Sequence, residues 1–415
     1  MLKKVIVIGG GIIGLCSAYY LLKEGYSVTV IEKEDLTKGA SNINAGFIAP
    51  SHIISLASPG MINKGLKMMW NKSSPFYIKP RWDTEFLDWA WKFKKSSTTT
   101  KVSKSVPILK DLLSKSQVLF EELIREVDFP IHYEKKGLLS VYSTNKTAKE
   151  EIEKARKIKA EGLEVDLLNR EEILELQPSL SDKVTGAVHY IDNSHATPNT
   201  FMRSLYEWLK GEGVKFNLEE EVCDFEKQGE KLIGVKTEKD FYTADEFILC
   251  AGSWTAALAR KLDLKIVLQG GKGYSIDAFN ENKISIPTIL CEAKVAVTPM
   301  DGFTRFAGTM EFSGQNEIIR AERVKAIVKA ATTYYKDVEI SEAEIKAARS
   351  GLRPVSPDGL PYIGRPGKYH NLIISTGHAM IGWSLGPVTG KLVSDIIASK
   401  RTEVNMEPFS PERRF

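Results

Sequence analysis

The spacing of apolar and polar positions changes along this chain, and the changes predict where strands and helices lie. Residues 5–8 are apolar and β-branched, and they lead directly into the glycine-rich residues 9–14. Apolar residues then recur at helical spacing as far as residue 22, Gly25 interrupts the pattern, and a second β-branched run covers residues 28–31. A strand, a glycine turn, a helix and a second strand in this order predict a βαβ unit with parallel strands.

The same reading predicts elements along the rest of the chain. Helical periodicity predicts helices over residues 105–127, 146–161, 198–211, 316–335 and 386–398. Short apolar runs predict strands over residues 137–143, 215–218, 221–225, 247–250, 269–275, 305–311 and 372–376. Asn169, which acidic residues follow, is expected to cap a helix that ends at Pro178. Strands that alternate with helices in this way indicate the α/β class.

Length and composition narrow the class of protein further. A chain of 415 residues is too long for one compact core, so about two domains are expected. The net charge of +4 gives no sign of a nucleic-acid partner. The cysteines have neither C-x-x-C nor metal-like spacing, so we expect no disulfide framework and no metal site. No apolar stretch reaches the ~20 residues that span a bilayer. We therefore expect a cytoplasmic protein, or one bound peripherally to the inner face of the membrane.

The first functional signal lies in Gly9-x-Gly11-x-x-Gly14 and in Glu32. Gly9 would allow a tight turn, Gly11 would leave room for a pyrophosphate, and Gly14 would let the helix pack closely on the strand. Glu32 follows Gly14 by 18 residues, near the ~20 expected for a carboxylate that binds ribose hydroxyls. Since this carboxylate would repel a 2′-phosphate, FAD or NAD is favoured over NADP. The alternative is a glycine-rich turn in an ordinary parallel sheet.

Three later stretches are rich in small residues and could also approach a nucleotide. Residues 38–46 are small and polar, although a solvent loop would have a similar composition. The strand at 247–250 ends in Ala251-Gly252-x-Trp254, and the strand at 372–376 ends in the glycine-rich residues 377–383. The apolar helix that follows residues 377–383 would point the positive end of its dipole at an electron-rich group.

Residues 51–110 differ from the rest because aromatic and basic side chains are interleaved there. The simpler interpretation is the first half of a substrate domain with aromatic residues in its core. The alternative is a docking face for a membrane surface or a partner subunit, since tryptophan and phenylalanine mixed with lysine are typical of interfacial helices. Residues 64–95 carry most of this signal.

Taken together, the motifs resemble the family of FAD-dependent D-amino-acid dehydrogenases and oxidases over essentially the whole chain. The resemblance is closest to the bacterial D-amino-acid dehydrogenases, with glycine oxidases and D-hydroxyproline dehydrogenases as near relatives. Six separate motifs carry it: Gly9-x-Gly11-x-x-Gly14 with Glu32, Ser41-Asn42-x-Asn44-Ala45-Gly46, Ala251-Gly252-x-Trp254, Lys272-Gly273-Tyr274-Ser275, Gly351-Leu352-Arg353-Pro354 with Pro357-Asp358-Gly359, and Thr376-Gly377-His378 with Gly382-Trp383.

The resemblance implies noncovalent FAD and a set of residues that contact it. The family's covalent variants attach the flavin through a cysteine near the arginine segment, and this chain has none after Cys291. The implied cofactor contacts are Gly9, Gly11, Ile12, Ile13, Gly14, Glu32, Lys33, Ala40, Ser41, Asn44, Ala45, Gly46, Phe47, Val222, Ala251, Gly252, Trp254, Gly377, His378, Met380, Ile381, Gly382 and Trp383.

Four residues are implied for the substrate. Arg353 matches the arginine that binds the substrate carboxylate, and its planar guanidinium suits such an anion in any case. A structural ion pair is the alternative for Arg353. Tyr274 could add a hydroxyl to the same carboxylate or be a buried core tyrosine. His52 and His378 could bind substrate or be hydrogen-bonded loop histidines.

The implied reaction is oxidative deamination of a D-amino acid, with electrons passed to a quinone or another acceptor. A D-hydroxyproline or D-proline dehydrogenase, a glycine or D-amino-acid oxidase, and an electron-relay or docking subunit of a larger complex stay open as alternatives. The implied fold is a Rossmann-type FAD-binding domain on a parallel sheet, with a discontinuous α+β substrate domain on an antiparallel sheet. The expected FAD-binding domain is formed by residues 1–52, 184–264 and 350–415, and the substrate domain by residues 53–183 and 265–349.

Overall fold

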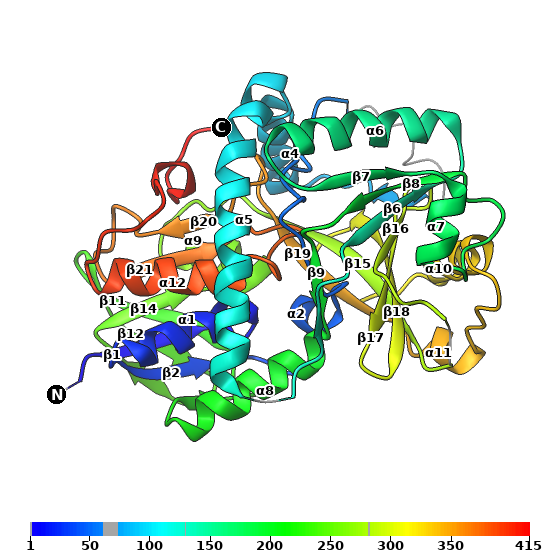
Figure 1. Cartoon of the computed structure of the whole chain (residues 1–415). Coiled ribbons are helices and arrows are strands. Elements are labelled where there is room, and N and C mark those ends of the chain that lie inside the picture. The colour runs from blue at the N-terminus through cyan, green and yellow to red at the C-terminus, as the bar shows by residue number, and fades with distance from the viewer. Residues whose placement is uncertain (1, 61–73, 129, 281–282) are drawn as a thin grey trace.

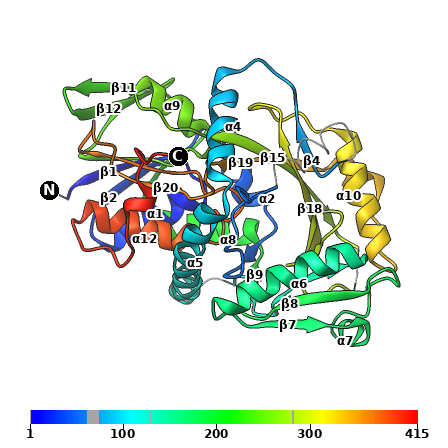
Figure 2. The ribbon, with the colours of Figure 1, turned by 90° about the horizontal axis from the view of Figure 1, so that it is seen from above.

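The computed structural model describes residues 2–60, 74–128, 130–280 and 283–415, and two large sheets dominate it. One sheet has six strands and the other has nine. Figure 1 shows that they lie on opposite sides of helix α5 (Thr99–Val127). Figure 2, seen from above, has the same arrangement. The chain is thus a mixed α/β protein with one largely parallel and one largely antiparallel sheet, which confirms the predicted class.

The six-stranded sheet contains the predicted βαβ unit. Its strands lie in the order β10-β2-β1-β14-β21-β20, and all neighbours are parallel except β20, which is antiparallel to β21. The bounds are β1 (Lys4–Ile8), β2 (Ser27–Ile31), β10 (Lys215–Asn217), β14 (Glu246–Leu249), β20 (Tyr362–Gly364) and β21 (Leu372–Thr376).

Both faces of this sheet are covered, which explains why its strands are continuous apolar runs. In β1, Val5 and Val7 pack into the core formed with α1 (Ile12–Lys23), α5, α8 (Pro198–Gly211) and α12 (Gly386–Ile397). Ile6 and Ile8 point to the other face, where they meet α9 (Thr255–Lys261) and a small antiparallel sheet. This small sheet is formed by β11 (Val222–Gln228), β12 (Lys231–Thr237) and β13 (Phe241–Thr243).

The nine-stranded sheet runs β19-β15-β18-β17-β16-β6-β8-β7, and β4 pairs with β18. Its core packs against α10 (Ala321–Tyr334), which begins five residues later than the predicted 316. The strands are β4 (Phe76–Ile78), β6 (Leu138–Tyr142), β7 (Val165–Leu168), β8 (Gly186–Tyr190), β15 (Gln269–Ala278), β16 (Thr288–Leu290), β17 (Val295–Met300), β18 (Phe303–Phe312) and β19 (Arg349–Val355). The helices around it are α4 (Thr84–Ser96), α6 (Asn145–Ala160), α7 (Arg170–Leu176), which Asn169 caps as predicted, and α11 (Glu342–Lys346).

Strand pairing crosses two of the predicted domain boundaries. β8 lies in the segment assigned to the FAD-binding domain from residue 184, but it pairs with β6 and β7 of the nine-stranded sheet. β19 crosses the boundary at residue 350 and pairs with β15 of the same sheet. Helix α5 was assigned to the substrate domain, yet its apolar face packs on the core of the six-stranded sheet. An apolar run does not reveal which of two sheets it joins, so the sequence alone could not assign these pairings.

The remaining elements bridge the two large sheets. β3 (Phe47–Ile48), β9 (Ser194–Ala196) and β5 (Tyr133–Glu134) form a second small antiparallel sheet. The short helix α2 (Ala40–Ile43) lies against β19. Two 3₁₀ turns, Gly252–Trp254 and Glu407–Phe409, complete the described elements.

The aromatic and basic segment falls only partly within the described chain. Residues 64–73 of the predicted docking segment lie outside the described residues. In α4, Phe86, Trp89 and Phe93 are buried against Phe312 and Val355, as the core interpretation predicts. The other side of this segment is exposed, because Trp82 is fully accessible, Trp91 is 59% accessible and Leu87 is 50% accessible. Among the described residues, no helix combines the length and the apolar content that crossing a bilayer would require.

Candidate active site

One elongated cavity of about 550 Å³ joins the glycine turn after β1 to the nine-stranded sheet. It is lined by residues 8–13, by Glu32 and by Val222. Residues 40–44 and 251–254, Arg353 and Trp383 also line it. A long groove that starts at the carboxyl ends of parallel strands is where this type of sheet binds nucleotides.

The glycines of the first turn are required by close backbone contacts. Gly9 has φ of +114°, and a Cβ there would lie 2.7 Å from the Cys250 carbonyl oxygen. A Cβ on Gly14 would lie 1.9 Å from the Gly9 carbonyl oxygen, so only glycine lets α1 start this close to β1. Gly11 is the N-cap of α1 and provides no side-chain cap. The N–H of Ile13, which lines the cavity in the first turn of the helix, has no acceptor within the described chain, and such a group suits a phosphate.

Glu32 is held at the end of β2 by two backbone amides. Gly10 N–H donates to its Oε2 at 2.6 Å, and Glu34 N–H donates to its Oε1 at 3.0 Å. Each oxygen keeps a lone pair that can accept a hydrogen bond from a ligand hydroxyl group. Burial raises the pKa of this carboxyl, and the two amides oppose that rise. Beside it, Lys33 Nζ lies 3.9 Å from the ring centre of Trp254, so this basic side chain covers the wall formed by residues 251–254.

The loop after β2 is held by the nine-stranded sheet. Asn44 donates its amide to Ser41 O at 2.8 Å and accepts from Gly46 N–H at 2.7 Å, so this side chain fixes its own turn. Arg305 is fully buried and donates to the carbonyl oxygens of Asn42 and Asn44 at 2.8 and 3.0 Å. Ser41 Oγ accepts the Ile12 N–H at 3.0 Å. The loop is thereby fixed between the start of α1 and the substrate-side sheet.

The turn before α12 presents unpaired amides. Gly377 and Ala379 have φ of +83° and +48°, and the Ala379 N–H donates to Pro354 O at 2.8 Å. Within the described chain, the N–H groups of Met380, Gly382 and Trp383 have no acceptor. Two buried polar atoms on the same wall, Ser375 Oγ and Trp383 Nε1, also lack a partner there. Such a group of free donors indicates that a polar ligand belongs beside it.

Arg353 lies on β19 and lines the cavity. Its NH1 donates to the Thr309 carbonyl at 3.0 Å, and no described carboxylate lies within ion-pair distance. Burial lowers the pKa of its guanidinium to about 10. The register of β15 and β18 shifts between Lys272 and Tyr274, and Thr309 at this bulge has φ of +71°. A Cβ on Gly273 would lie 2.1 Å from Arg353 NH1, so the glycine makes room for the guanidinium.

The structural ion pair considered for Arg353 is thus absent from the described chain. A half-buried guanidinium with one carbonyl acceptor retains several N–H donors. A strained β-branched residue in a bulge is costly and is typical of functional sites. The arrangement therefore suits an anionic group that enters from the cavity.

Tyr274 lines the cavity, but its hydroxyl is used inside the protein. It donates to Glu311 Oε2 at 2.9 Å, and both residues are almost completely buried. Glu311 is also paired with Arg323 Nε at 2.8 Å and with Arg320 Nε at 3.1 Å. The structure therefore supports the buried tyrosine rather than a substrate-binding hydroxyl.

The two histidines also differ from the functional expectation. His378 Nε2 is 3.1 Å from Thr389 Oγ1, and burial lowers the pKa of this imidazole to about 3. His52 does not line the cavity. Its ring is tilted against the ring of Phe47, with the two ring centres 6.3 Å apart. Burial lowers the pKa of His52 to about 4. Both side chains are therefore neutral in the ordinary pH range, and His378 matches the hydrogen-bonded loop histidine considered as its alternative.

Most of the predicted cofactor residues line the cavity, and six do not. Those outside it are Gly14, Ala45, Gly46, Phe47, Gly377 and Ile381. Gly46 is instead needed by β9, because a Cβ there would lie 2.3 Å from the Ala196 carbonyl oxygen. Gly14 and Gly377 act through backbone packing and turn geometry. The sequence analysis missed Leu36, Leu258, Lys261, Ala307, Glu317 and Ser375, which also line the cavity. No local motif marks these residues, although Ala307 and Ser375 lie in predicted strands and Glu317 lies in a predicted helix.

Comparison with known proteins identifies the family. The model of the family described as FAD dependent oxidoreductase (DAO) matches residues 4–396. The chain belongs to this FAD-dependent oxidoreductase family. A D-amino acid dehydrogenase of Helicobacter pylori is 30% identical over 410 residues, which cover 98% of each chain. A D-amino acid dehydrogenase of Vibrio atlanticus is 30% identical over 419 residues, which cover 99% of each chain.

Solved structures show the same fold for this FAD-dependent oxidoreductase. Glycine oxidase from Geobacillus kaustophilus superimposes with a TM-score of 0.79 at 21% identity and covers all of both chains. L-proline dehydrogenase from P. horikoshii gives a TM-score of 0.71 at 18% identity, with 99% of this chain and 97% of that chain covered. The Rossmann-type cofactor domain predicted from the first motif is thereby confirmed.

The cavity of this FAD-dependent oxidoreductase fits its cofactor. The crowded glycines and free amides of α1 suit a pyrophosphate, and Glu32 suits ribose hydroxyls. The unpaired donors of residues 380–383 lie on the wall near Arg353 and suit the electron-rich carbonyl edge of a flavin. A single continuous cavity links these groups, as a long dinucleotide requires.

Proposed function

We propose that this FAD-dependent oxidoreductase is a D-amino acid dehydrogenase that converts a D-amino acid to a 2-oxo acid and ammonia. The observation that carries the proposal is the guanidinium of Arg353, which lacks a described carboxylate partner and lines the cofactor cavity. The full-length relatives named D-amino acid dehydrogenase support the same substrate class.

Arg353 would bind the substrate carboxylate through two parallel N–H groups. Its contact with Thr309 O and the space above Gly273 hold the planar group in one orientation. A bidentate pair fixes the direction of the bound carboxylate as well as its position. The α-carbon is then held beside the flavin-binding wall, and orientation of this kind supplies much of the rate enhancement.

The chemistry of the redox step belongs to the cofactor. FAD, when bound, accepts a hydride from the substrate α-carbon. As the hydride leaves, the amine nitrogen forms a C=N double bond with that carbon and one N–H proton passes to water. Hydrolysis of the imino acid by water gives the 2-oxo acid and ammonia.

No side chain in the described cavity is needed as a general base in this proposal. His378 is buried and neutral beside Thr389, and Tyr274 donates to Glu311. A substrate whose amine enters the cavity uncharged already has the lone pair that the C=N bond requires. The protein therefore supplies orientation and electrostatic stabilisation.

The test is anaerobic reduction of the purified flavoprotein by a panel of amino acids. Loss of the flavin absorbance with D-amino acids, and not with their L-forms, is the expected result. Fastest loss with D-proline or D-hydroxyproline would replace the proposal by a cyclic-substrate dehydrogenase. Fast peroxide release in air would replace it by a glycine or D-amino-acid oxidase. No loss with any substrate would overturn the catalytic role and favour a docking or relay subunit.

We propose further that the electrons pass to a quinone or similar acceptor at a membrane surface, and that the exposed side of α4 docks there. Leu87 and Trp91 project from this side, with Lys94 and Lys95 exposed beside them, and Trp82 is exposed just before the helix. Apolar side chains flanked by lysines suit an anionic membrane surface.

Flotation with vesicles of phosphatidylethanolamine and phosphatidylglycerol tests the docking proposal. The wild-type protein should float, and the Trp82→Ser/Trp91→Ser double variant should stay in solution. Val118→Ser, which removes an apolar side chain of α5 that is 56% accessible, is the control and should still float. Flotation of the double variant at the wild-type level would contradict the proposal.

A further inference from the structure

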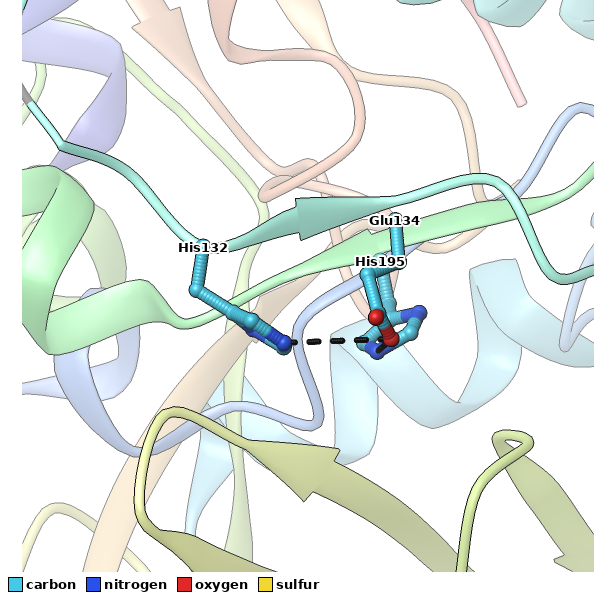
Figure 3. Close-up of side chains that lie close together, drawn as sticks. All are labelled: His132, Glu134 and His195. Carbon is cyan, nitrogen blue, oxygen red and sulfur yellow. Dashed lines mark ion pairs between the residues drawn. The ribbon is translucent and has the colours of Figure 1, made fainter.

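A second group of chemically active side chains lies outside the cofactor cavity, on the small sheet β3-β9-β5. His132 directly precedes β5, Glu134 lies on β5, and His195 lies opposite it on β9. Figure 3 shows the three side chains, with ion-pair lines joining each imidazole to the Glu134 carboxylate. None of the three lines the cofactor cavity.

Their geometry is close to that of a metal site. His195 Nε2 lies 3.4 Å and His132 Nε2 lies 3.8 Å from Glu134 Oε2. One ligand atom from each residue lies within 4.8 Å of the others, and this is the one such group among the described residues. Tetrahedral ligands about 2.1 Å from a zinc ion are about 3.4 Å apart. Small side-chain movements would therefore close the three atoms around one ion.

The hydrogen bonding of the three residues leaves the required lone pairs free. His195 is fully buried. Neither of its ring nitrogens makes a hydrogen bond of ordinary geometry within the described chain, although the Pro299 carbonyl group lies near the ring. An imidazole that is buried without a good partner is costly. A bound metal ion would supply the partner that this ring lacks.

His132 and Glu134 each have a second partner, which contacts the atom that would not bind the metal ion. His132 Nδ1 lies 3.0 Å from Thr197 Oγ1, which also accepts the Asp301 N–H. If Nδ1 carries the proton, Nε2 presents its lone pair to the site. Glu134 Oε1 pairs with Lys136 Nζ at 2.9 Å, which leaves Oε2 for the two imidazoles. Outer partners of this kind orient the ligands of metal sites.

We propose that His132, Glu134 and His195 form a binding site for a divalent transition-metal ion of the zinc type. Two imidazoles and one carboxylate are ligands that zinc accepts and that magnesium and calcium do not favour. His132 and Glu134 are partly exposed, so an ion can reach the site from solvent. Cysteine spacing gave no hint of it, because the ligands come from two strands that are remote in the sequence.

The site would act on the cofactor loop through β9. His195 is the register partner of Phe47 on β3 and of Glu134 on β5. The next residue, Ala196, donates its N–H to Gly46 O at 3.0 Å. A bound ion would thus link β5 to β9 and, through Ala196, restrain Gly46 at the end of the cofactor loop. The nine-stranded sheet already restrains residues 42–44 of this loop through Arg305. Its role is structural, and the reaction proposed above does not depend on it.

The experiment uses the FAD-loaded full chain after chelation and dialysis. Equilibrium dialysis against zinc chloride, with elemental analysis, should give one zinc ion per chain, and zinc should raise Tm by several degrees. Glu134→Gln and His132→Ala change partly exposed side chains, so both variants should fold and should bind zinc at least about tenfold more weakly. Magnesium chloride should leave Tm unchanged.

Two control variants separate this site from other zinc ligands. His370→Asn removes an exposed histidine, and Cys223→Ser removes the exposed thiol; both should bind zinc as the wild type does. Wild-type protein without bound zinc would overturn the proposal. Full zinc binding by Glu134→Gln and His132→Ala, or loss of binding in Cys223→Ser, would also overturn it. Retained catalytic activity of the zinc-free protein would leave the D-amino-acid proposal intact.

Discussion

Replacement of Arg353 by methionine should change activity and stability in opposite directions. The guanidinium is half-buried and has Thr309 O as its single described acceptor. Burial lowers the pKa of this group from 12.5 to about 10, which corresponds to about 3 kcal/mol. Arginine is charged in both the folded and the unfolded chain at pH 7, so the folded state carries this cost in full. Because the side chain is half-buried and not sealed from water, we expect Arg353→Met to stabilise the fold by about 1–3 kcal/mol.

The same substitution should strongly reduce catalysis. Two charge-assisted hydrogen bonds to the substrate carboxylate contribute about 3–5 kcal/mol together. Their loss should lower kcat/KM for D-amino acids by about 10²–10³-fold or more. Arg353→Lys keeps the charge and loses the planar fork, so it should fall between the wild type and Arg353→Met.

The assays are anaerobic flavin reduction and thermal unfolding, with flavin content measured in each variant. Propionate, a simple carboxylate, should raise Tm of the wild type and leave that of Arg353→Met unchanged. The control is Arg170→Ala, which breaks an exposed ion pair between Arg170 on α7 and Asp182. This variant should retain the wild-type kcat/KM. If Arg353→Met unfolds more easily and retains wild-type kcat/KM, Arg353 is a structural residue and the reasoning is refuted.

Three further substitutions test the cofactor site and its surroundings. Gly14→Ala places a Cβ 1.9 Å from the Gly9 carbonyl oxygen, so the purified variant should contain little flavin by absorbance. In the control Gly211→Ala, the new Cβ meets no atom within 4 Å, so that variant should contain a full complement of flavin. Glu32→Gln should weaken FAD binding by about 10–100-fold in fluorescence titrations of the apoprotein, since two charge-assisted ribose contacts become neutral; unchanged affinity would refute the ribose role. The pKa of His378 is lowered to about 3, so the unfolded chain binds more protons below pH 6.5 and stability should fall by about 2 kcal/mol between pH 7 and 5. His378→Gln should remove that part of the acid sensitivity in urea unfolding, and an unchanged pH dependence would show that the imidazole is not buried neutral.

The sequence predicted those parts of the site that depend on local backbone geometry. Gly9, Gly11 and Gly14 are required where a strand, a turn and a helix follow one another directly, so their spacing alone indicates the cradle. Arg353 was found through the motif around it and not through any partner, because Thr309 and Gly273 lie on other strands. Tyr274 was placed correctly on the cavity wall, but its hydroxyl belongs to Glu311, 37 residues away in sequence. No local pattern reports a contact of that kind.

The same distinction explains why strand pairing crosses the predicted domain boundaries. A strand such as β8 has the same apolar pattern whichever sheet it joins, and only its partners β6 and β7 decide the matter. Arg305 shows the consequence for function. This fully buried side chain pairs with Asp277 on β15 and donates to the backbone of residues 42–44, so a residue of the substrate-side sheet sets the conformation of a cofactor loop. The two domains therefore do not build their sites separately. The residues that line the cavity beside the glycine turn and those around Arg353 share one framework, so a carboxylate bound at Arg353, as proposed, would be aligned with the proposed flavin-binding wall.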